Sequence, residues 1–225
     1  MKLSHEEEKN NRFFSSDFQQ NYYFNKTGLM YPEQYLFDKY IDNSKNVLDL
    51  GCGAGRTTAY ISQITLNVIG VDINDKLVTL AKQKMPKTDF RVMNACSLEF
   101  PDNVFDVIVF SYNGIDYIYP EEKRILAYKE IYRVLKKDGI FIYSTHNKVS
   151  PFTSLNTLFG LPLSIFTLKI LTSYRYSLHK NGFLLGHVSS EKKELQWLRV
   201  FGYKVIEILP QKTKINYWNH YVIEK

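Results

Sequence analysis

From Asn46 onwards, short apolar runs alternate with stretches whose apolar residues recur every three or four positions. The runs are NVLDL (46–50), NVIGVDI (67–73), FRVMNA (90–95), FDVIVFS (105–111) and IFIYSTH (140–146). Strand-like runs that alternate with helical periodicity are typical of βαβ units and a parallel sheet. Five strands with four intervening helices are therefore expected to form a doubly wound α/β sheet.

Two of the intervening segments have clear helical signals. In residues 75–85, one helical face carries Leu77, Leu80, Ala81 and Met85, and Pro86 closes the segment. Residues 120–139 (PEEKRILAYKEIYRVLKKDG) begin with proline and two glutamates and end in lysines before Asp138 and Gly139. This second segment is the clearest predicted helix of the chain.

Both ends of the chain depart from this rhythm. Residues 1–45 are predicted to form an aromatic-rich helical cap over the carboxyl edge of the sheet, and residues 148–188, which have no clean period, an inserted lid. Ser189 or Ser190 can cap a helix that ends at Gly202. The strand-like runs YKVIEILP and NYWNHYVIEK follow, joined by a linker too short for a helical crossover, so they are expected to pair antiparallel. We expect one domain over residues 1–225.

Composition narrows the class of protein. The chain has 225 residues, 44% of them hydrophobic, and a formal net charge of +6 whose lysines are spread along the whole length. Nucleic-acid binding is therefore disfavoured. Cys52 and Cys96 are the only cysteines, so neither a disulfide framework nor a zinc cluster is expected. The first residues carry an acidic run and no apolar core of a signal peptide, which predicts a cytoplasmic location.

The turn after the first strand is rich in glycine and points to a ligand. It reads Gly51-Cys52-Gly53-Ala54-Gly55, with Arg56 where a dinucleotide fingerprint would have a third glycine. Asp49 at its base would repel phosphate and attract an ammonium group. Asp72 lies about twenty residues beyond the first glycine, at the spacing of a carboxylate that binds ribose hydroxyls. The predicted ligand is a nucleoside with a cationic, amino-acid-like tail.

At this point the sequence resembles the class I S-adenosylmethionine-dependent methyltransferases. The resemblance rests on VLDLGCGAGRTT, VIGVDIN, NACSLEFPDNVFDVIVFS and EIYRVLKKDGIFIYSTHN, in the order and spacing of the family, and covers residues 44–147 most strongly. It implies a Rossmann-like seven-stranded sheet with an antiparallel last strand. It also implies S-adenosylmethionine as the cofactor.

The resemblance assigns roles to residues of this chain. Asp49 and the backbone of Gly51, Cys52 and Gly53 are expected to receive the methionine amino and carboxylate groups, with Arg56 adding positive charge. Asp72 is expected to bind the ribose hydroxyls, and Ile73 to pack on the adenine. The other expected cofactor contacts follow the third and fourth strands: Asn94, Ala95 and Cys96 near the adenine, and Ser111, Tyr112 and Asn113 near the methyl end. Tyr22 or Tyr23 is either core packing or a lid over the methionine.

The donor is already activated, so the enzyme chiefly positions the acceptor, and catalytic residues can be few. His146, after the fifth strand, is the predicted general base; His187 and Asp116 are further candidates, with structural roles as the alternative for each. No metal is expected. The acceptor is predicted to be a small molecule with an oxygen, nitrogen or carbon nucleophile. An RNA methyltransferase and a non-catalytic S-adenosylmethionine-binding protein are the alternatives.

Residues 149–171 (VSPFTSLNTLFGLPLSIFTLKIL) are long and apolar, with Lys169 as their only charge. A helical lid over the acceptor is the favoured interpretation, with Phe152, Leu158, Phe159 and Phe166 shaping the site. There are two alternatives: a lid that also contacts a membrane, or a subunit interface. The chain is thus expected to be a monomer or a homodimer.

Overall fold

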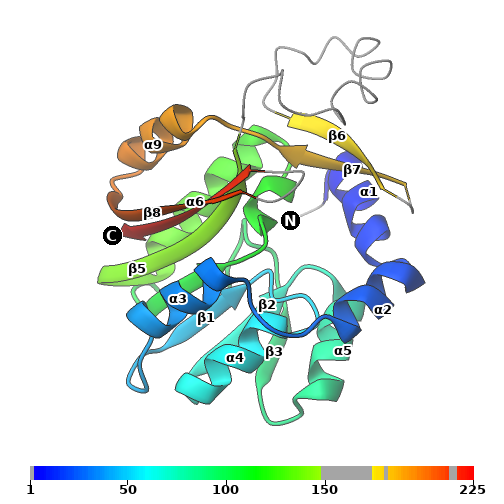
Figure 1. Cartoon of the computed structure of the whole chain (residues 1–225), viewed down its shortest axis with the longest axis horizontal. Coiled ribbons are helices and arrows are strands. Elements are labelled where there is room, and N and C mark those ends of the chain that lie inside the picture. Colours follow the sequence, from blue (N-terminus) through cyan, green and yellow to red (C-terminus); the bar gives the residue numbers. More distant parts are fainter. Residues whose placement is uncertain (1–2, 148–173, 180–181, 213–216) are drawn as a thin grey trace.

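The computed structural model describes residues 3–147, 174–179, 182–212 and 217–225, and its centre is one seven-stranded sheet (Figure 1). The strands are β1 (Val47–Leu50), β2 (Val68–Asp72), β3 (Asp89–Val92), β4 (Phe105–Phe110), β5 (Leu135–His146), β8 (Lys204–Lys212) and β9 (Tyr217–Glu224). They lie in the order β3-β2-β1-β4-β5-β9-β8. β1 to β5 are parallel, and β9 is antiparallel to both β5 and β8. The predicted sheet with its antiparallel last strand is confirmed.

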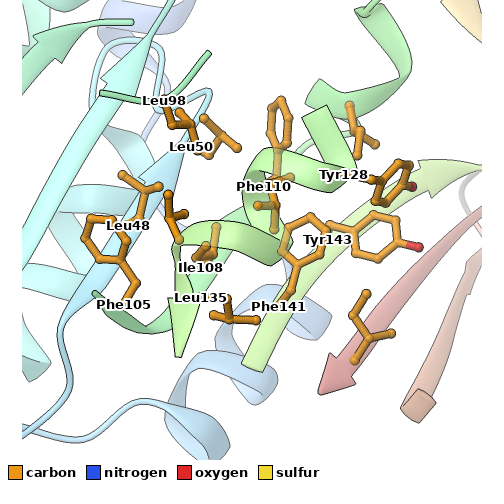
Figure 2. Packing of buried hydrophobic residues seen from close by; sticks show 14 of the residues in the cluster. Leu48, Leu50, Leu98, Phe105, Ile108, Phe110, Tyr128, Leu135, Phe141 and Tyr143 are labelled. Atoms are coloured by element: carbon orange, nitrogen blue, oxygen red, sulfur yellow. The ribbon is translucent and has the colours of Figure 1, made fainter. Parts of the chain in front are cut away.

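Alternate residues of the central strands pack on opposite faces of the sheet, as expected for strands buried on both sides. On one face, Val47 and Val107 pack with residues of α3 (Tyr31–Tyr40) and α4 (Arg56–Ile64). On the other, Leu48 and Ile108 pack with α6 (Glu121–Val134) and α9 (Glu191–Val200), as Figure 2 shows for Tyr128 of α6. The two apolar layers fix the sheet and therefore its carboxyl edge.

The connections differ from the prediction in two places. α4 and α5 (Asp75–Lys84) join the first three strands, but the segment between β3 and β4 contains no helix, so the prediction of four intervening helices is wrong. That segment is held by backbone and side-chain bonds instead, such as Leu98 N–H to Glu130 at 2.8 Å. The helix predicted over 120–139 ends at Val134, because Leu135 already pairs with Phe105 as the start of β5.

The N-terminal residues form the three helices α1 (His5–Phe14), α2 (Asp17–Asn25) and α3. Ser4 and Glu7 form a capping box at the start of α1. Residues of α1 and α2 reach the carboxyl edge of the sheet, as expected for a cap. α3 does not: its apolar residues Leu36 and Phe37 are fully buried against one face of the sheet, in the same cluster as Val47 and Val107.

A two-stranded antiparallel hairpin of β6 (Tyr174–His179) and β7 (Gly182–His187) stands beside α1 (Figure 1). The side chain of Asn10 on α1 joins them, since it donates to the Leu185 carbonyl at 2.9 Å and accepts from the Leu185 N–H at 3.1 Å. The irregular apolar pattern gave no prediction of these strands. The lid predicted over 149–171, with its four named apolar side chains, lies outside the described residues.

Candidate active site

A cavity of about 170 Å³ lies at the carboxyl ends of the parallel strands, beneath α1 and α2. Open α/β sheets bind ligands at this edge. Eight residues predicted from the sequence to contact the cofactor line the cavity: Gly51, Gly53, Asp72, Ile73, Asn94, Ala95, Ser111 and Tyr112. The structure therefore brings together residues that lie up to 61 positions apart in the sequence.

The glycine turn forms the floor of this cavity. Gly51 has a φ of +67°, and a Cβ there would lie 2.4 Å from Cε2 of Phe110. Only glycine fits both the left-handed backbone and the close approach of the ring. The turn is tied to the neighbouring strand by a bond from Cys52 N–H to the Val71 carbonyl at 3.0 Å. This bond fixes the position of the turn beside the end of β2.

Asp72 ends β2 with its carboxylate fixed on both oxygens. Oδ2 accepts from Gly53 N–H and Oδ1 from Asn74 N–H, each at 2.8 Å. A carboxylate has about four lone-pair positions, so each oxygen keeps capacity for a further donor. Burial raises the pKa of Asp72, against backbone hydrogen bonds from Asn74, Gly53 and Ile73 that lower it. Beside it, Ile73 keeps 39% of its surface exposed as an apolar platform.

Asp49 lies beneath the turn, outside the cavity lining. It is 1% exposed, and its Oδ2 accepts from the hydroxyls of Thr57 at 2.7 Å and Thr58 at 2.5 Å. Burial raises the pKa of Asp49 to about 6. No partner for Oδ1 is found among the described residues. In this structure the carboxylate organises the start of α4 rather than facing the cavity.

Both cysteines also lie outside the lining. Cys52 is buried among Val78, Ala81 and Phe90, and burial raises the pKa of its thiol well above the usual value. The Cys96 thiol donates to the Lys123 carbonyl at 3.2 Å. Asn94 does line the cavity, but its side-chain oxygen already accepts from Cys96 N–H at 2.9 Å. One lone pair of that oxygen remains for a ligand.

Arg56 is committed to an ion pair and does not line the cavity. Its two terminal nitrogens each lie 2.7 Å from an oxygen of Glu33, which is 1% exposed. The guanidinium also donates to the Gly28 carbonyl at 3.1 Å and stands 5.5 Å from the centre of the Tyr112 ring. This bidentate pair ties α4 to α3, and its charge is largely neutralised by Glu33.

A second group of polar side chains lies beside the cavity, around His146 at the end of β5. Nδ1 of His146 lies 2.9 Å from Oδ2 of Asp116, and its Nε2 lies 3.3 Å from Nδ2 of Asn113. Asp116 is fully buried on η1 (Gly114–Tyr117), with Nδ1 of His187 at 3.6 Å from its other oxygen. Burial raises the pKa of Asp116, but hydrogen bonds from the two histidines outweigh it and the net shift is downward. All three candidates for proton transfer named from the sequence therefore meet here.

Several residues of the cavity wall were not predicted from the sequence. Asn10, Asn11 and Phe14 of α1 line it, as does Asn74 at the start of α5. Asn74 donates to the side chain of Asn11 at 2.7 Å and to the Ser15 hydroxyl at 2.8 Å, which binds the cap to the sheet. The two asparagines of α1 were detectable only as polar residues on the inner face of an aromatic-rich helix. Tyr23, one of the two tyrosines considered for a lid, lines the cavity.

Comparison with known proteins identifies the fold and the class. Residues 48–143 match a family described as a methyltransferase domain. A probable S-adenosylmethionine-dependent methyltransferase of Mycolicibacterium smegmatis is 29% identical over 132 residues, which are 59% of this chain and 48% of that protein. A ubiquinone/menaquinone biosynthesis C-methyltransferase of Citrobacter koseri is 36% identical over 108 residues, 44% of this chain and 41% of that protein. The chain thus spans about half the length of these curated relatives.

Solved structures agree with the fold over nearly the whole chain. A methyltransferase of Methanosarcina mazei matches with a TM-score of 0.70 at 19% identity, covering 87% of this chain and 98% of that one. A Burkholderia thailandensis 1,6-didemethyltoxoflavin-N1-methyltransferase, solved with its substrate and S-adenosylhomocysteine, matches with a TM-score of 0.67 at 17% identity, covering 100% and 92%. The resemblance found in the sequence is confirmed by the match of residues 48–143 to a methyltransferase domain family and by the fold that these solved structures share with the chain.

The described part of the chain contains no group of three or more histidine, cysteine or acidic side chains arranged to hold a metal ion. None of its helices is both long and apolar enough to cross a membrane.

Proposed function

We propose that this protein transfers a methyl group from S-adenosylmethionine to a small-molecule acceptor. The observation that carries the proposal is the position of Asp72, whose two backbone-anchored oxygens face a cavity at the carboxyl edge of the sheet. The match of residues 48–143 to the methyltransferase domain family supports it. So does the similarity to the Citrobacter ubiquinone/menaquinone biosynthesis C-methyltransferase and to the Burkholderia 1,6-didemethyltoxoflavin-N1-methyltransferase.

The residues present suit this cofactor. Asp72 offers lone pairs for two ribose hydroxyls, Ile73 offers an apolar face for adenine, and the absent Cβ of Gly51 lets the Phe110 ring pack directly against the glycine turn. Asn94, Ala95 and Ser111 complete the contacts that we assign to the cofactor. When bound, S-adenosylmethionine supplies a methyl group on a sulfonium, so the acceptor needs only a free lone pair and correct alignment.

We assign the general base to His146. The carboxylate of Asp116 accepts a hydrogen bond from Nδ1–H, which leaves Nε2 as the nitrogen with a lone pair. In this structure that lone pair accepts from the amide of Asn113, and 23% of the imidazole side chain is exposed. An acceptor hydroxyl or amine that replaces Asn113 as the donor to Nε2 would lose its proton to His146, and Asp116 would stabilise the imidazolium that forms.

Arg56, Asp49, Cys52, Cys96 and Asn113 take supporting positions in this proposal. Each is buried or paired close to the cavity rather than on its wall. They shape the glycine turn, the α3–α4 contact and the orientation of His146. Contact with the cofactor through these five side chains would require them to leave the partners that the structure shows.

The proposal is tested by incubating the purified protein with radiolabelled S-adenosylmethionine and a panel of acceptors. The panel contains hydroxylated rings, amines, quinones and a bulk RNA sample. Transfer of the label to a small molecule supports the proposal if this transfer is lost when Asp72 is replaced. Label in RNA alone would show the alternative activity on nucleic acid, and cofactor binding without transfer to any acceptor would favour a binding protein.

A further inference from the structure

Seven aromatic side chains form a closed chain of contacts, and four of them line the cavity. They come from α1, α2, the turn after β4, η1, β5 and β9. We call them the aromatic collar: Phe14, Tyr22, Tyr23, Tyr112, Tyr117, His146 and Trp218.

Each neighbour in the collar is in contact with the next. On the side of the N-terminal helices, Tyr22 meets Tyr23 with ring centres 5.1 Å apart, and Phe14 lies 6.1 Å from Tyr23 and 5.5 Å from Tyr117. The collar then continues to the strands. His146 stands 6.1 Å from Tyr117 and 5.9 Å from Trp218, and Trp218 stands 5.2 Å from Tyr112. The hydroxyls of Tyr112 and Tyr22, 3.4 Å apart, close it.

The collar borders the cofactor cavity and includes the proposed base. Phe14, Tyr23, Tyr112 and Tyr117 line the cavity, whereas His146 belongs to the part of the collar next to the sheet strands. Of its six ring-to-ring contacts, five are edge-on and the sixth is tilted at 53°, so no two neighbouring rings of the collar are stacked face to face. Such a frame suits a planar apolar ligand.

The charge at the rim of the collar favours a ligand of one charge over the other. Nζ of Lys26 lies 3.4 Å from the centre of the Tyr112 ring and donates to the Tyr22 hydroxyl at 3.2 Å. Among the described residues no carboxylate lies within ion-pair distance of Lys26, whereas Arg56 nearby is neutralised by Glu33. A charged ligand group that pairs with Lys26 at this place must therefore be an anion. A cationic ligand would meet an ammonium already placed on Tyr112.

Tyr112 is held in place for this role by its backbone. Tyr112 and Asn113 are consecutive residues with positive φ, 55° and 58°, directly after β4. Two non-glycine residues in the left-handed region cost free energy that the surrounding contacts must offset, and such strain concentrates at ligand sites. The turn directs the Tyr112 ring toward Lys26 and the Asn113 amide toward His146.

We infer that the aromatic collar is the acceptor site, and that the acceptor is a planar aromatic molecule with an anionic substituent bound by Lys26 and an ionisable hydroxyl or amine directed at His146. This inference rests on the proposed function and names the substrate class of the same site. No covalent step is added to those already described.

The test measures binding to protein saturated with S-adenosylhomocysteine, after calorimetry has shown that this cofactor product binds. The probes are hydroxynaphthoate, naphthol, cyclohexanecarboxylate and naphthylmethylamine. We expect hydroxynaphthoate to bind at least about tenfold more tightly than each of the other three. Lys26→Met should remove most of its advantage over naphthol and leave naphthol binding unchanged. Trp218→Leu, with folding checked by thermal denaturation, should weaken both aromatic probes.

The matched control is Lys84→Met. Nζ of Lys84 also lies over an aromatic ring, 4.5 Å from the centre of Phe24, but Phe24 is outside the collar. This variant should bind every probe like the wild-type protein. The inference is overturned if naphthylmethylamine or cyclohexanecarboxylate binds as tightly as hydroxynaphthoate, or if no aromatic probe binds. It is also overturned if Lys26→Met weakens S-adenosylhomocysteine instead, since Lys26 then serves the cofactor. Failure of S-adenosylhomocysteine to bind wild-type protein would contradict the proposed function itself.

Discussion

His146 and Asp116 are joined twice: the imidazole Nδ1 and the backbone N–H of His146 both lie within 2.9 Å of the same carboxylate oxygen of Asp116. The backbone contact fixes the end of β5, and the ring contact fixes the orientation of the imidazole. Because Asp116 is fully buried, these bonds are not in competition with water. One carboxylate therefore sets both the position and the tautomer of the proposed base.

Asp116→Asn should separate these two roles. The amide keeps the shape of the side chain but removes the charge that stabilises an imidazolium, so we expect kcat to fall by on the order of 10²–10⁴ with little change in the KM for S-adenosylmethionine. Nitrogen chemical shifts of the imidazole report the tautomer independently of activity. In the wild-type protein Nδ1 should carry the proton; protonation only at Nε2, or an unchanged kcat in the variant, would remove His146 as the base.

Gly51→Ala tests the close packing beneath the cavity, and Gly28→Ala provides its matched control. Both glycines have a positive φ, +67° and +72°, but a Cβ on Gly28 would meet nothing within 4 Å. We expect Gly28→Ala to lower the free energy of unfolding by about 1 kcal/mol. Gly51→Ala should cost about 1–3 kcal/mol more, because Phe110 must move, and should also weaken cofactor binding.

Denaturant unfolding of the two glycine variants measures these costs. Equal losses in both would mean that the left-handed backbone, rather than the contact with Phe110, makes Gly51 necessary. In that case the ring of Phe110 yields easily and does not shape the cavity floor.

The sequence was informative wherever neighbouring positions carry the signal. The glycine turn, Asp72 and the last antiparallel strand were predicted because period, spacing and linker length depend on residues close together in the chain. The end of α6 was not predicted, because Val134 and Leu135 are both apolar and either a helix or a strand accommodates them. Only the pairing of Leu135 with Phe105 decides between the two.

Partners distant in the sequence explain the differences at the site. Arg56 lies one residue after the glycine turn and was expected to face the cofactor, but Glu33, twenty-three positions earlier, binds it. No local pattern links those two residues. In the same way the aromatic collar joins Phe14 to Trp218, and the β6–β7 hairpin is held to α1 through Asn10. Each depends on tertiary contacts that periodicity does not encode.

Glu33→Gln should show how much the ion pair with Arg56 contributes to the free energy of unfolding. Removing one charge leaves the guanidinium, 10% exposed, without its carboxylate, so we expect the free energy of unfolding to fall by about 3–5 kcal/mol. Lys39→Gln serves as the control, since the Lys39 ammonium is solvent-exposed and its ion pair with Glu207 should contribute little to stability. A loss in Glu33→Gln no larger than in the control would show that Arg56 finds another partner.

Asp49 gives the stability a pH dependence of known sign. Its pKa of about 6 in the folded protein lies above the ordinary value of 3.8, because burial disfavours the charge. The folded state therefore binds more protons between these two values, and the stability contribution of Asp49 increases as the pH falls through about 6. This contribution is lost as the pH rises through the folded pKa.

Comparison with Asp49→Asn isolates this effect. Between about pH 7.5 and pH 5, the wild-type protein should gain on the order of 1 kcal/mol of unfolding free energy relative to the variant. Urea unfolding at each pH, without cofactor, measures the difference. A constant difference across this range, or one of opposite sign, would mean that Asp49 is charged throughout and that its unpartnered oxygen finds a donor.

The most direct test of the central claim is calorimetric titration of S-adenosylhomocysteine into the wild-type protein and Asp72→Ala, with Asp75→Ala as an exposed control. If the cavity binds this cofactor through Asp72, the wild-type protein and Asp75→Ala should bind it equally. A folded Asp72→Ala protein should then bind it more weakly by about 1.5–3 kcal/mol. Unchanged affinity in Asp72→Ala, or wild-type binding of NAD in preference to S-adenosylhomocysteine, would contradict the account.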